Sequence, residues 1–336
     1  MIKLYKLLTL FLISTCCYGQ SKTMVIELDP ALFQKDFAKY ESTTALYCGQ
    51  LSEMAYWKSD LVTEAYEKIK NTYPENNLNF TFLDNIETHA QALLWCTNEF
   101  LVISFRGTEP SKIKDVITDI KLWNYSNIPS ENDRYANMPS GHGGFRKSLM
   151  ELIRSENIFD EIDAIIAKTN PDANRSTFPI YLTGHSLGAA ISQLFIECLN
   201  YKKYNFSGAY HFAPPLAVSC EMNEYMRQSY GDKVYDIVNY KDYIPRAGRN
   251  GVAHFGQFLR ICNDGFLYKE RSAYVKFTIK EYFSALKYHK LDNHLITIRD
   301  PENSLTNIID RSTGEFPCMG DNIKYINPCS PIVNKN

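Results

Sequence analysis

The stretch Phe178-Pro-Ile-Tyr-Leu-Thr-Gly-His-Ser186-Leu-Gly188 decides the fold of this 336-residue chain. An apolar run leads into the pattern Gly-x-Ser-x-Gly, in which a serine occupies a tight turn between a strand and a helix. Gly184 and Gly188 stand two positions before and after Ser186, where only very small residues let the strand and the helix approach closely. Residues 187–199 then place apolar side chains on one face at helical spacing. The stretch therefore predicts a buried strand, a nucleophilic serine and a helix packed on the core.

Strand-like and helical segments alternate through most of the chain. This alternation predicts an α/β fold, with a central, mostly parallel sheet flanked by helices on both faces. Short apolar runs bounded by turn residues indicate the strands, and apolar residues at helical spacing indicate the helices. The predicted helices cover residues 45–57, 145–168 and 187–199, and the predicted strands cover residues 92–96, 100–105, 206–212, 234–240 and 255–262.

Charge and histidine placement exclude several classes of function. The formal net charge is −2 and no long run carries one sign, so we expect no nucleic-acid partner. The seven histidines are scattered and no Cys/His spacing is typical of a zinc site. We therefore expect no metal and no cofactor. The composition is that of a globular protein, which we expect to be a monomer.

Residues 1–19 have the pattern of a signal peptide. A short basic start precedes an apolar stretch at 7–13 that is too short to span a membrane, and small and polar residues follow. We expect a secreted or periplasmic protein. The alternative is a membrane-anchored lipoprotein, acylated at Cys16 or Cys17 after cleavage.

The rest of the chain is predicted to form one α/β domain over 20–300 and a loop-rich C-terminal tail over 301–336, where Pro, Asn, Gly and Cys accumulate. Seven cysteines follow residue 19, so an exported protein keeps at least one thiol. Cys198, on the apolar face of the helix after the serine, is the candidate for that thiol. Cys318 and Cys329 could close a loop in the tail, although the sequence does not determine the connectivity.

A serine hydroxyl needs a histidine to take its proton and a carboxylate to orient that histidine. In chains with this serine motif the partners follow in the order Ser, Asp, His. Asp242 follows the strand predicted at 234–240, at the edge where functional groups of an α/β sheet gather. Asp236 is the alternative, but it lies inside that strand. We predict Asp242 as the acid.

Three histidines follow Asp242 and compete for the role of base. His254 stands at the start of a strand-like run, where a structural, hydrogen-bonded imidazole is expected. His289 closes a helical stretch rich in aromatic residues and lysine, where a histidine interacts favourably with the helix dipole. His294 is predicted in a loop before the apolar run 295–298, and loops on a rigid scaffold carry catalytic groups. We predict His294 as the base, with His289 as the alternative.

An oxyanion hole needs two donors directed at the charge that develops on a substrate carbonyl. The backbone N–H of Leu187, at the start of the helix, is one candidate. The second donor must follow an earlier strand, and Thr108 fits because Gly107 lets the chain turn where the strand ends. Thr108 can offer both an N–H and a hydroxyl.

Six segments together resemble the class 3 (fungal-type) lipase family, in the order that the family shows. The resemblance covers roughly residues 40–300 and implies an α/β-hydrolase fold. The usual proline after the catalytic Asp is replaced by Tyr243, and the region around His294 is only loosely patterned. The segments are Ser104-Phe-Arg-Gly-Thr108, Asp115-Val-Ile-Thr-Asp119, Gly141-His-Gly-Gly-Phe145, Thr183-Gly-His-Ser-Leu-Gly188, Asn239-Tyr-Lys-Asp-Tyr-Ile-Pro-Arg246 and Ala253-His-Phe-Gly256.

This resemblance implies hydrolysis of acylglycerols or related carboxylic esters through an acyl-enzyme. It supports Ser186, Asp242 and His294 as the triad, Thr108 with Leu187 as the oxyanion hole, and a non-catalytic role for His254. The substrate is then a lipid or a small ester, with transient contact to a lipid interface. Alternatives within the hydrolases are a phospholipase A1, a non-lipid carboxylesterase and an amidase or peptidase. The alternative from another class is an inactive lipid-binding protein on the same fold.

Related enzymes place a lid between Thr108 and Gly141. Apolar and charged residues alternate here at helical spacing over 109–125. Two interpretations stay open: a surface helix packed on the core, or a cover over the site that opens against lipid.

Overall fold

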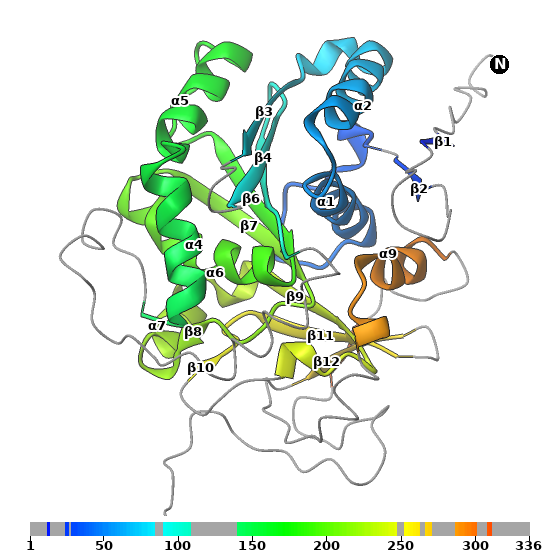
Figure 1. The fold of residues 1–336 in the computed structure, drawn as a ribbon, viewed down its shortest axis with the longest axis vertical. Helices are drawn as coiled ribbons and strands as arrows, with labels where there is room; N and C mark the ends of the chain where they lie inside the picture. Colours follow the sequence, from blue (N-terminus) through cyan, green and yellow to red (C-terminus); the bar gives the residue numbers. More distant parts are fainter. Residues whose placement is uncertain are drawn as a thin grey trace, which may run out of the picture.

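A nine-stranded sheet forms the centre of the protein in the computed structural model (Figure 1). Its strands lie in the order β13-β12-β11-β9-β7-β6-β5-β4-β3. The structure describes residues 12–13, 24–26, 28–84, 90–108, 140–246, 252–262, 266–270, 286–300 and 308–310. The nine strands are β3 (Asn79–Asp84), β4 (Gln91–Cys96), β5 (Leu101–Phe105), β6 (Pro179–His185), β7 (Asn205–Phe212), β9 (Val234–Asn239), β11 (Gln257–Ile261), β12 (Leu267–Glu270) and β13 (Ile308–Asp310).

Five adjacent strands run in the same direction and make the middle of the sheet. β5 pairs with β6, β6 with β7, β7 with β9 and β9 with β11, all parallel. The antiparallel strands lie outside them, since β3 and β4 extend one side and β12 reverses direction beside β11. The carboxyl ends of the five parallel strands therefore meet at one edge, where the predicted site residues follow β5, β6 and β9.

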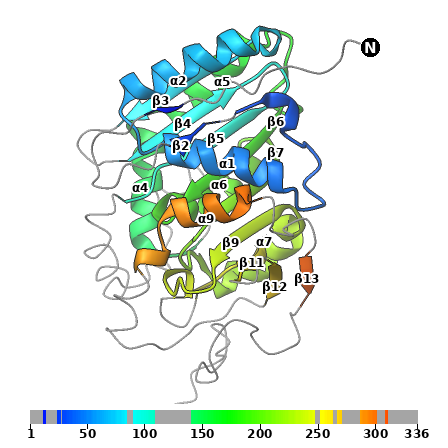
Figure 2. The same cartoon turned by 90° about the vertical axis from the view of Figure 1, so that its right-hand side faces the viewer.

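Helices cover both faces of the sheet, which confirms the predicted α/β class (Figures 1 and 2). One face carries α1, α2 and α9, and the other carries α4, α5 and α6. The main helices are α1 (Ser42–Met54), α2 (Ser59–Thr72), α4 (Gly143–Arg154), α5 (Ile158–Thr169), α6 (Leu187–Tyr201), α7 (Cys220–Tyr230) and α9 (Leu291–Arg299).

Two apolar cores lie on the two sides of the sheet. Successive residues of a strand point to opposite faces, so Leu93 and Trp95 of β4 join the core under α1 and α2, whereas Leu94 joins the core under α4 to α6. In β6 the same alternation sends Tyr181 to the first core and Leu182 to the second. This two-sided burial explains why the strands read as continuous apolar runs.

The remaining elements are short. β1 (Leu12–Ile13) pairs with β2 (Met24–Val25), and β8 (Val218–Ser219) pairs with β10 (Val252–Ala253). Five single turns of 3-10 helix complete the described chain: η1 (Pro30–Leu32), η2 (Pro74–Asn76), η4 (Gly231–Lys233), η5 (Ile244–Arg246) and η6 (Leu286–Tyr288).

Most of the predicted elements are confirmed, with two differences. The helix predicted at 145–168 is broken into α4 and α5, because Asn157 adopts a left-handed conformation with φ 48°. The tail predicted as loop-rich supplies β13, which pairs with β12. The lid segment 109–125 and the pair Cys318 and Cys329 lie outside the described residues, as do residues 1–19 except for β1.

The described cysteines divide into two groups. Cys198 is a buried thiol, as the sequence predicts, and Cys48 and Cys96 are buried thiols too. Cys220 and Cys262 are each disulfide-bonded. None of the helices in the described part of the chain combines the length and the apolar character needed to cross a membrane.

Candidate active site

Ser186 lies on the sharp turn between β6 and α6, in a backbone conformation that side chains rarely adopt. Its φ is 58° and its ψ is −124°. The two flanking glycines make the turn sterically feasible: a Cβ atom on Gly184 would lie 2.6 Å from the carbonyl carbon of Gly188, and one on Gly188 would overlap the carbonyl oxygen of Phe105. The backbone N–H of Ser186 donates to the Phe212 carbonyl at 2.9 Å, which ties the turn to β7. Strain of this kind is typical of functional turns.

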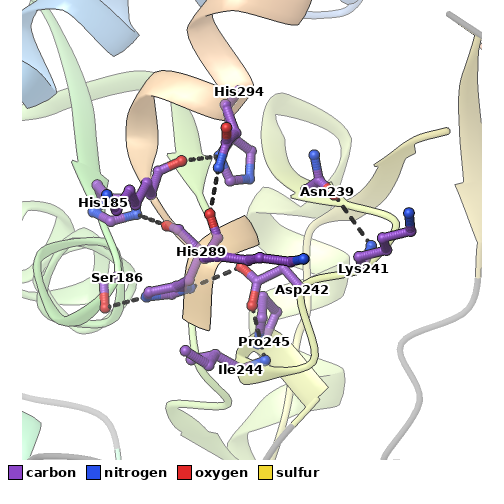
Figure 3. Close-up of polar contacts among 12 residues, drawn as sticks. His185, Ser186, Asn239, Lys241, Asp242, Ile244, Pro245, His289 and His294 are labelled. Atoms are coloured by element: carbon purple, nitrogen blue, oxygen red, sulfur yellow. Dashed lines mark hydrogen bonds and ion pairs between the residues drawn. The ribbon is translucent and has the colours of Figure 1, made fainter. Parts of the chain in front are cut away.

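His289 connects Ser186 to Asp242 (Figure 3). Its Nε2 lies 2.7 Å from the Ser186 hydroxyl oxygen, and its Nδ1 lies 2.7 Å from Oδ2 of Asp242. The carboxylate can only accept, so Nδ1 carries a proton and the serine hydroxyl donates to Nε2. All three side chains are buried. This is the arrangement in which a histidine can withdraw the proton of a serine while a carboxylate stabilises the resulting imidazolium.

Asp242 is held in place by the turn that follows β9. Its second carboxylate oxygen, Oδ1, accepts from the backbone N–H of Ile244 at 3.0 Å, and its own N–H donates to the carbonyl of Asn239. One oxygen is therefore used to orient the carboxylate and the other faces His289. The acid is positioned by local backbone geometry at the end of a parallel strand.

The prediction that His294 lies against Ser186 and Asp242 is wrong, and His289 takes that place. His294 lies within α9, and its Nδ1 is 3.2 Å from the carbonyl of Lys290, one turn earlier. Its ring packs near His185 and Phe212. The segment before residue 295 is the first turn of a helix and not the predicted loop.

A signal for this helix is present in the sequence. Leu291, Leu295 and Ile298 recur at helical spacing, and all three are buried in the core that α1 and α2 also cover. His294 falls on the same buried face, which sends its side chain into the core. His289 precedes the helix, in the short connection after η6, and can turn toward the strand ends.

Asp236 and His254 belong to a separate buried cluster. Asp236 Oδ1 is 3.0 Å from Nδ1 of His211, and Oδ2 is 3.3 Å from Nδ1 of His254. Burial opposes the charge of Asp236, but hydrogen bonds and charge from the two histidines hold its pKa well below the usual range. His254 also contacts the Pro245 carbonyl through Nε2 at 2.8 Å, which agrees with the predicted structural role.

The candidate oxyanion donors follow two adjacent strands. Phe105, the last residue of β5, pairs with Gly184 of β6, so the chain at 106–108 continues beside the serine turn. Leu187 is the first residue of α6, and the first amides of a helix have no acceptor within that helix. Thr108 is half-buried. Thr108 therefore follows the carboxyl end of β5, and Leu187 follows Ser186 at the carboxyl end of the adjacent strand β6.

Within the described residues, no three His, Cys, Asp or Glu side chains are grouped so that they could hold a metal ion. The contacts among Ser186, His289 and Asp242 offer the chemistry of a serine, an imidazole and a carboxylate, assisted by backbone amides.

Part of the chain matches a known family. Residues 102–250 match the family described as lipase (class 3). A comparison with curated proteins finds no match.

Three solved structures share the fold. The lipase of Rhizomucor miehei in its propeptide complex is 21% identical with a TM-score of 0.50, over 65% of this chain and 67% of that chain. A lipase from Rhizopus microsporus var. chinensis is 18% identical with a TM-score of 0.51, over 74% of this chain and 83% of that chain. A triacylglycerol lipase whose catalytic centre is described as a serine protease triad is 22% identical with a TM-score of 0.50, over 65% of this chain and 78% of that chain.

Proposed function

We propose that this chain cleaves acylglycerols or related lipid esters, with Ser186, His289 and Asp242 as its triad. Residues 102–250 match the class 3 lipase family, a family of carboxylic ester hydrolases. The observation that carries the proposal is the continuous set of contacts from the Ser186 hydroxyl through the His289 ring to Asp242, each at 2.7 Å.

The reaction follows from these contacts. As the Ser186 oxygen attacks the ester carbonyl, its proton passes to Nε2 of His289, and Asp242 stabilises the imidazolium through Nδ1. The negative charge that forms on the carbonyl oxygen is received by the Leu187 N–H and by Thr108. His289 then gives the proton to the leaving alcohol, and an acyl-enzyme remains. Water, deprotonated by the same imidazole, releases the acid.

Two features support a lipid substrate and export. A solved structure that shares the fold is a triacylglycerol lipase, which favours an acylglycerol substrate over a small polar ester. Cys220 and Cys262 are disulfide-bonded, and disulfides persist mainly outside the cytosol, so we also propose that the protein is exported after removal of residues 1–19.

The test is hydrolysis of p-nitrophenyl esters of short and long acyl chains, and of emulsified triacylglycerol, by the mature protein. We expect Ser186→Ala to abolish activity and fluorophosphonate labelling. His289→Ala should lower kcat/KM by roughly 10³-fold or more, because the base is lost. A chain-length preference for long acyl groups would favour a lipase over a small-ester esterase.

His294→Ala is the matched control, since His294 is a buried histidine of the same segment that does not contact Ser186. We expect its kcat/KM to stay within about tenfold of the wild type. The reverse pattern, with His294→Ala inactive and His289→Ala active, would contradict the triad. A folded wild type that neither hydrolyses esters nor reacts with a fluorophosphonate would instead support a lipid-binding role.

A further inference from the structure

His185, the residue immediately before the nucleophile, contacts the backbone of the residue that carries the base (Figure 3). Its Nε2 lies 2.7 Å from the carbonyl oxygen of His289, although the two residues are 104 positions apart in the chain. The two imidazole rings lie 4.9 Å apart between centroids. The His185 side chain is buried, so water does not compete for this contact.

The His289 carbonyl determines which nitrogen of His185 carries the proton, and Tyr56 contacts the other nitrogen. A carbonyl oxygen can only accept, so Nε2 of His185 must donate to His289. In a neutral imidazole the other nitrogen is then an acceptor, and the Tyr56 hydroxyl lies 2.9 Å from Nδ1, where it donates. Burial, together with the nearby His289 and His294, lowers the pKa of His185 well below its usual value, so this tautomer persists at neutral pH.

The same hydroxyl reaches the turn that precedes Thr108. Tyr56 interacts with the backbone of Gly107 through a hydrogen bond, and a Cβ on Gly107 would overlap that hydroxyl and the His185 carbonyl. Tyr56 follows α1, Gly107 follows β5, His185 ends β6 and His289 precedes α9. Hydrogen bonds therefore connect Gly107, in the candidate oxyanion turn, through Tyr56 to His185, which precedes Ser186, and from His185 to the base His289.

We infer that His185 is a positioning residue for His289, with Tyr56 holding the His185 ring through Nδ1. The inference rests on the proposed function, since His289 is the proposed base. The base follows η6 and precedes α9, and its ring must keep 2.7 Å contacts to both Ser186 and Asp242 while it gains and loses a proton. His185, at the end of the strand that precedes the nucleophile, donates to the carbonyl of His289 and so anchors the backbone of the base. Catalytic groups need such support, because a displacement of about 1 Å can cost 10²-fold in rate.

The experiment compares His185→Leu, which removes the donor, with His185→Gln, whose amide N–H can replace it. Hydrolysis of p-nitrophenyl butyrate should show kcat lowered roughly 10²-fold in His185→Leu, with KM within about threefold. His185→Gln should recover at least about tenfold of that loss. The rate of fluorophosphonate labelling of Ser186 should fall in parallel with kcat, since both depend on proton transfer to His289.

Tyr56→Phe tests the support of the His185 ring. Without the hydroxyl, Nδ1 of His185 loses its donor and the ring is held less firmly with Nε2 on the His289 carbonyl. We expect kcat to fall about tenfold in the wild-type background and to change little in the His185→Leu background. Tyr235→Phe is the matched control, because it removes a buried tyrosine hydroxyl that donates to the Phe37 carbonyl at 2.9 Å. Tyr235 lies near the start of β9, whereas Asp242 follows the end of that strand. It should lose stability but keep kcat within about twofold.

The outcomes separate this inference from the proposed function. An inactive, unlabelled wild type would overturn the function itself. An active wild type with unchanged kcat in folded His185→Leu would overturn only the positioning role. If His185→Leu fails to fold, full kcat in both His185→Gln and Tyr56→Phe, together with equal kcat in Tyr235→Phe, would overturn it as well.

Discussion

His294 shows how burial controls the chemistry of a single side chain. Burial raises the cost of its charged form and lowers its pKa to about 4, against partial compensation by the nearby Asp242. Burial also lowers the pKa of His185. Two imidazoles close to the proposed base are therefore neutral near pH 7, and His289 is left as the ring that both Ser186 and Asp242 contact.

The depressed pKa of His294 predicts a loss of stability in mild acid. The unfolded chain takes up a proton near pH 6.5 but the folded chain does so only near pH 4, so unfolding is increasingly favoured as the pH falls through this window. At pH 5 this amounts to about 2 kcal/mol for one histidine. Urea denaturation at pH 7.5 and pH 5 should show a larger decrease in the free energy of unfolding for the wild type than for His294→Gln. Equal decreases would contradict the prediction. His185 is present in both chains, and burial, the largest cause of its lowered pKa, acts in both, so the larger part of its contribution cancels.

At the scale of elements, the contact between α6 and the end of β5 determines where the nucleophile lies. Gly188, in the first turn of α6, faces the backbone of Phe105 and Arg106, and these atoms cannot rotate away as a flexible side chain would. The helix can approach β5 only because no Cβ is present there. The register between β5 and β6, with Phe105 opposite Gly184, then brings the candidate oxyanion turn beside Ser186.

Gly188→Ala should therefore displace α6 from β5. We expect a loss of about 2–3 kcal/mol in the free energy of unfolding and a decrease in kcat/KM of at least about 10²-fold, because backbone atoms must move. Asn200→Ala, at an exposed position of the same helix, is the control and should change neither quantity appreciably. Denaturation and ester hydrolysis measured on both variants check the prediction. Wild-type kinetics in Gly188→Ala would contradict the close approach.

At the scale of the whole molecule, the sheet divides the interior into two cores, and each contains at least one buried thiol. Cys48 of α1 lies in the core under α1, α2 and α9, whereas Cys96 of β4 and Cys198 of α6 lie in the core under α4 to α6. Burial raises the pKa of Cys96 to about 12 and that of Cys48 above its ordinary range, so neither thiol forms a reactive thiolate in the folded protein. Chemical modification of each thiol therefore measures whether the core around it has opened.

We predict that iodoacetamide modifies Cys48, Cys96 and Cys198 only when the whole molecule unfolds. The two cores share the strands of one sheet, so they should open together. Peptide mapping along a urea series should give one common midpoint for the three residues, equal to the midpoint measured by circular dichroism. Earlier modification of Cys48 alone would show instead that the helices on its side open independently.

The sequence by itself determined the features that depend on neighbours in the chain. The strand, turn and helix around Ser186 follow from steric requirements within five residues, and the alternation of buried runs and amphipathic helices determines the α/β class. Asp242 could be selected because its position depends only on where one strand ends.

The choice of His289 over His294 depended on tertiary structure. The base must meet a serine 103 positions earlier and a carboxylate 47 positions earlier, and no local pattern encodes those distances. Leu291, Leu295 and Ile298 pack α9 onto the core, and this packing turns His294 inward and leaves His289 at the strand ends. The direction in which a helical side chain points is determined only once the helix packs against a surface. Burial of the apolar face of α9 thus decided which of two nearby imidazoles reaches Ser186.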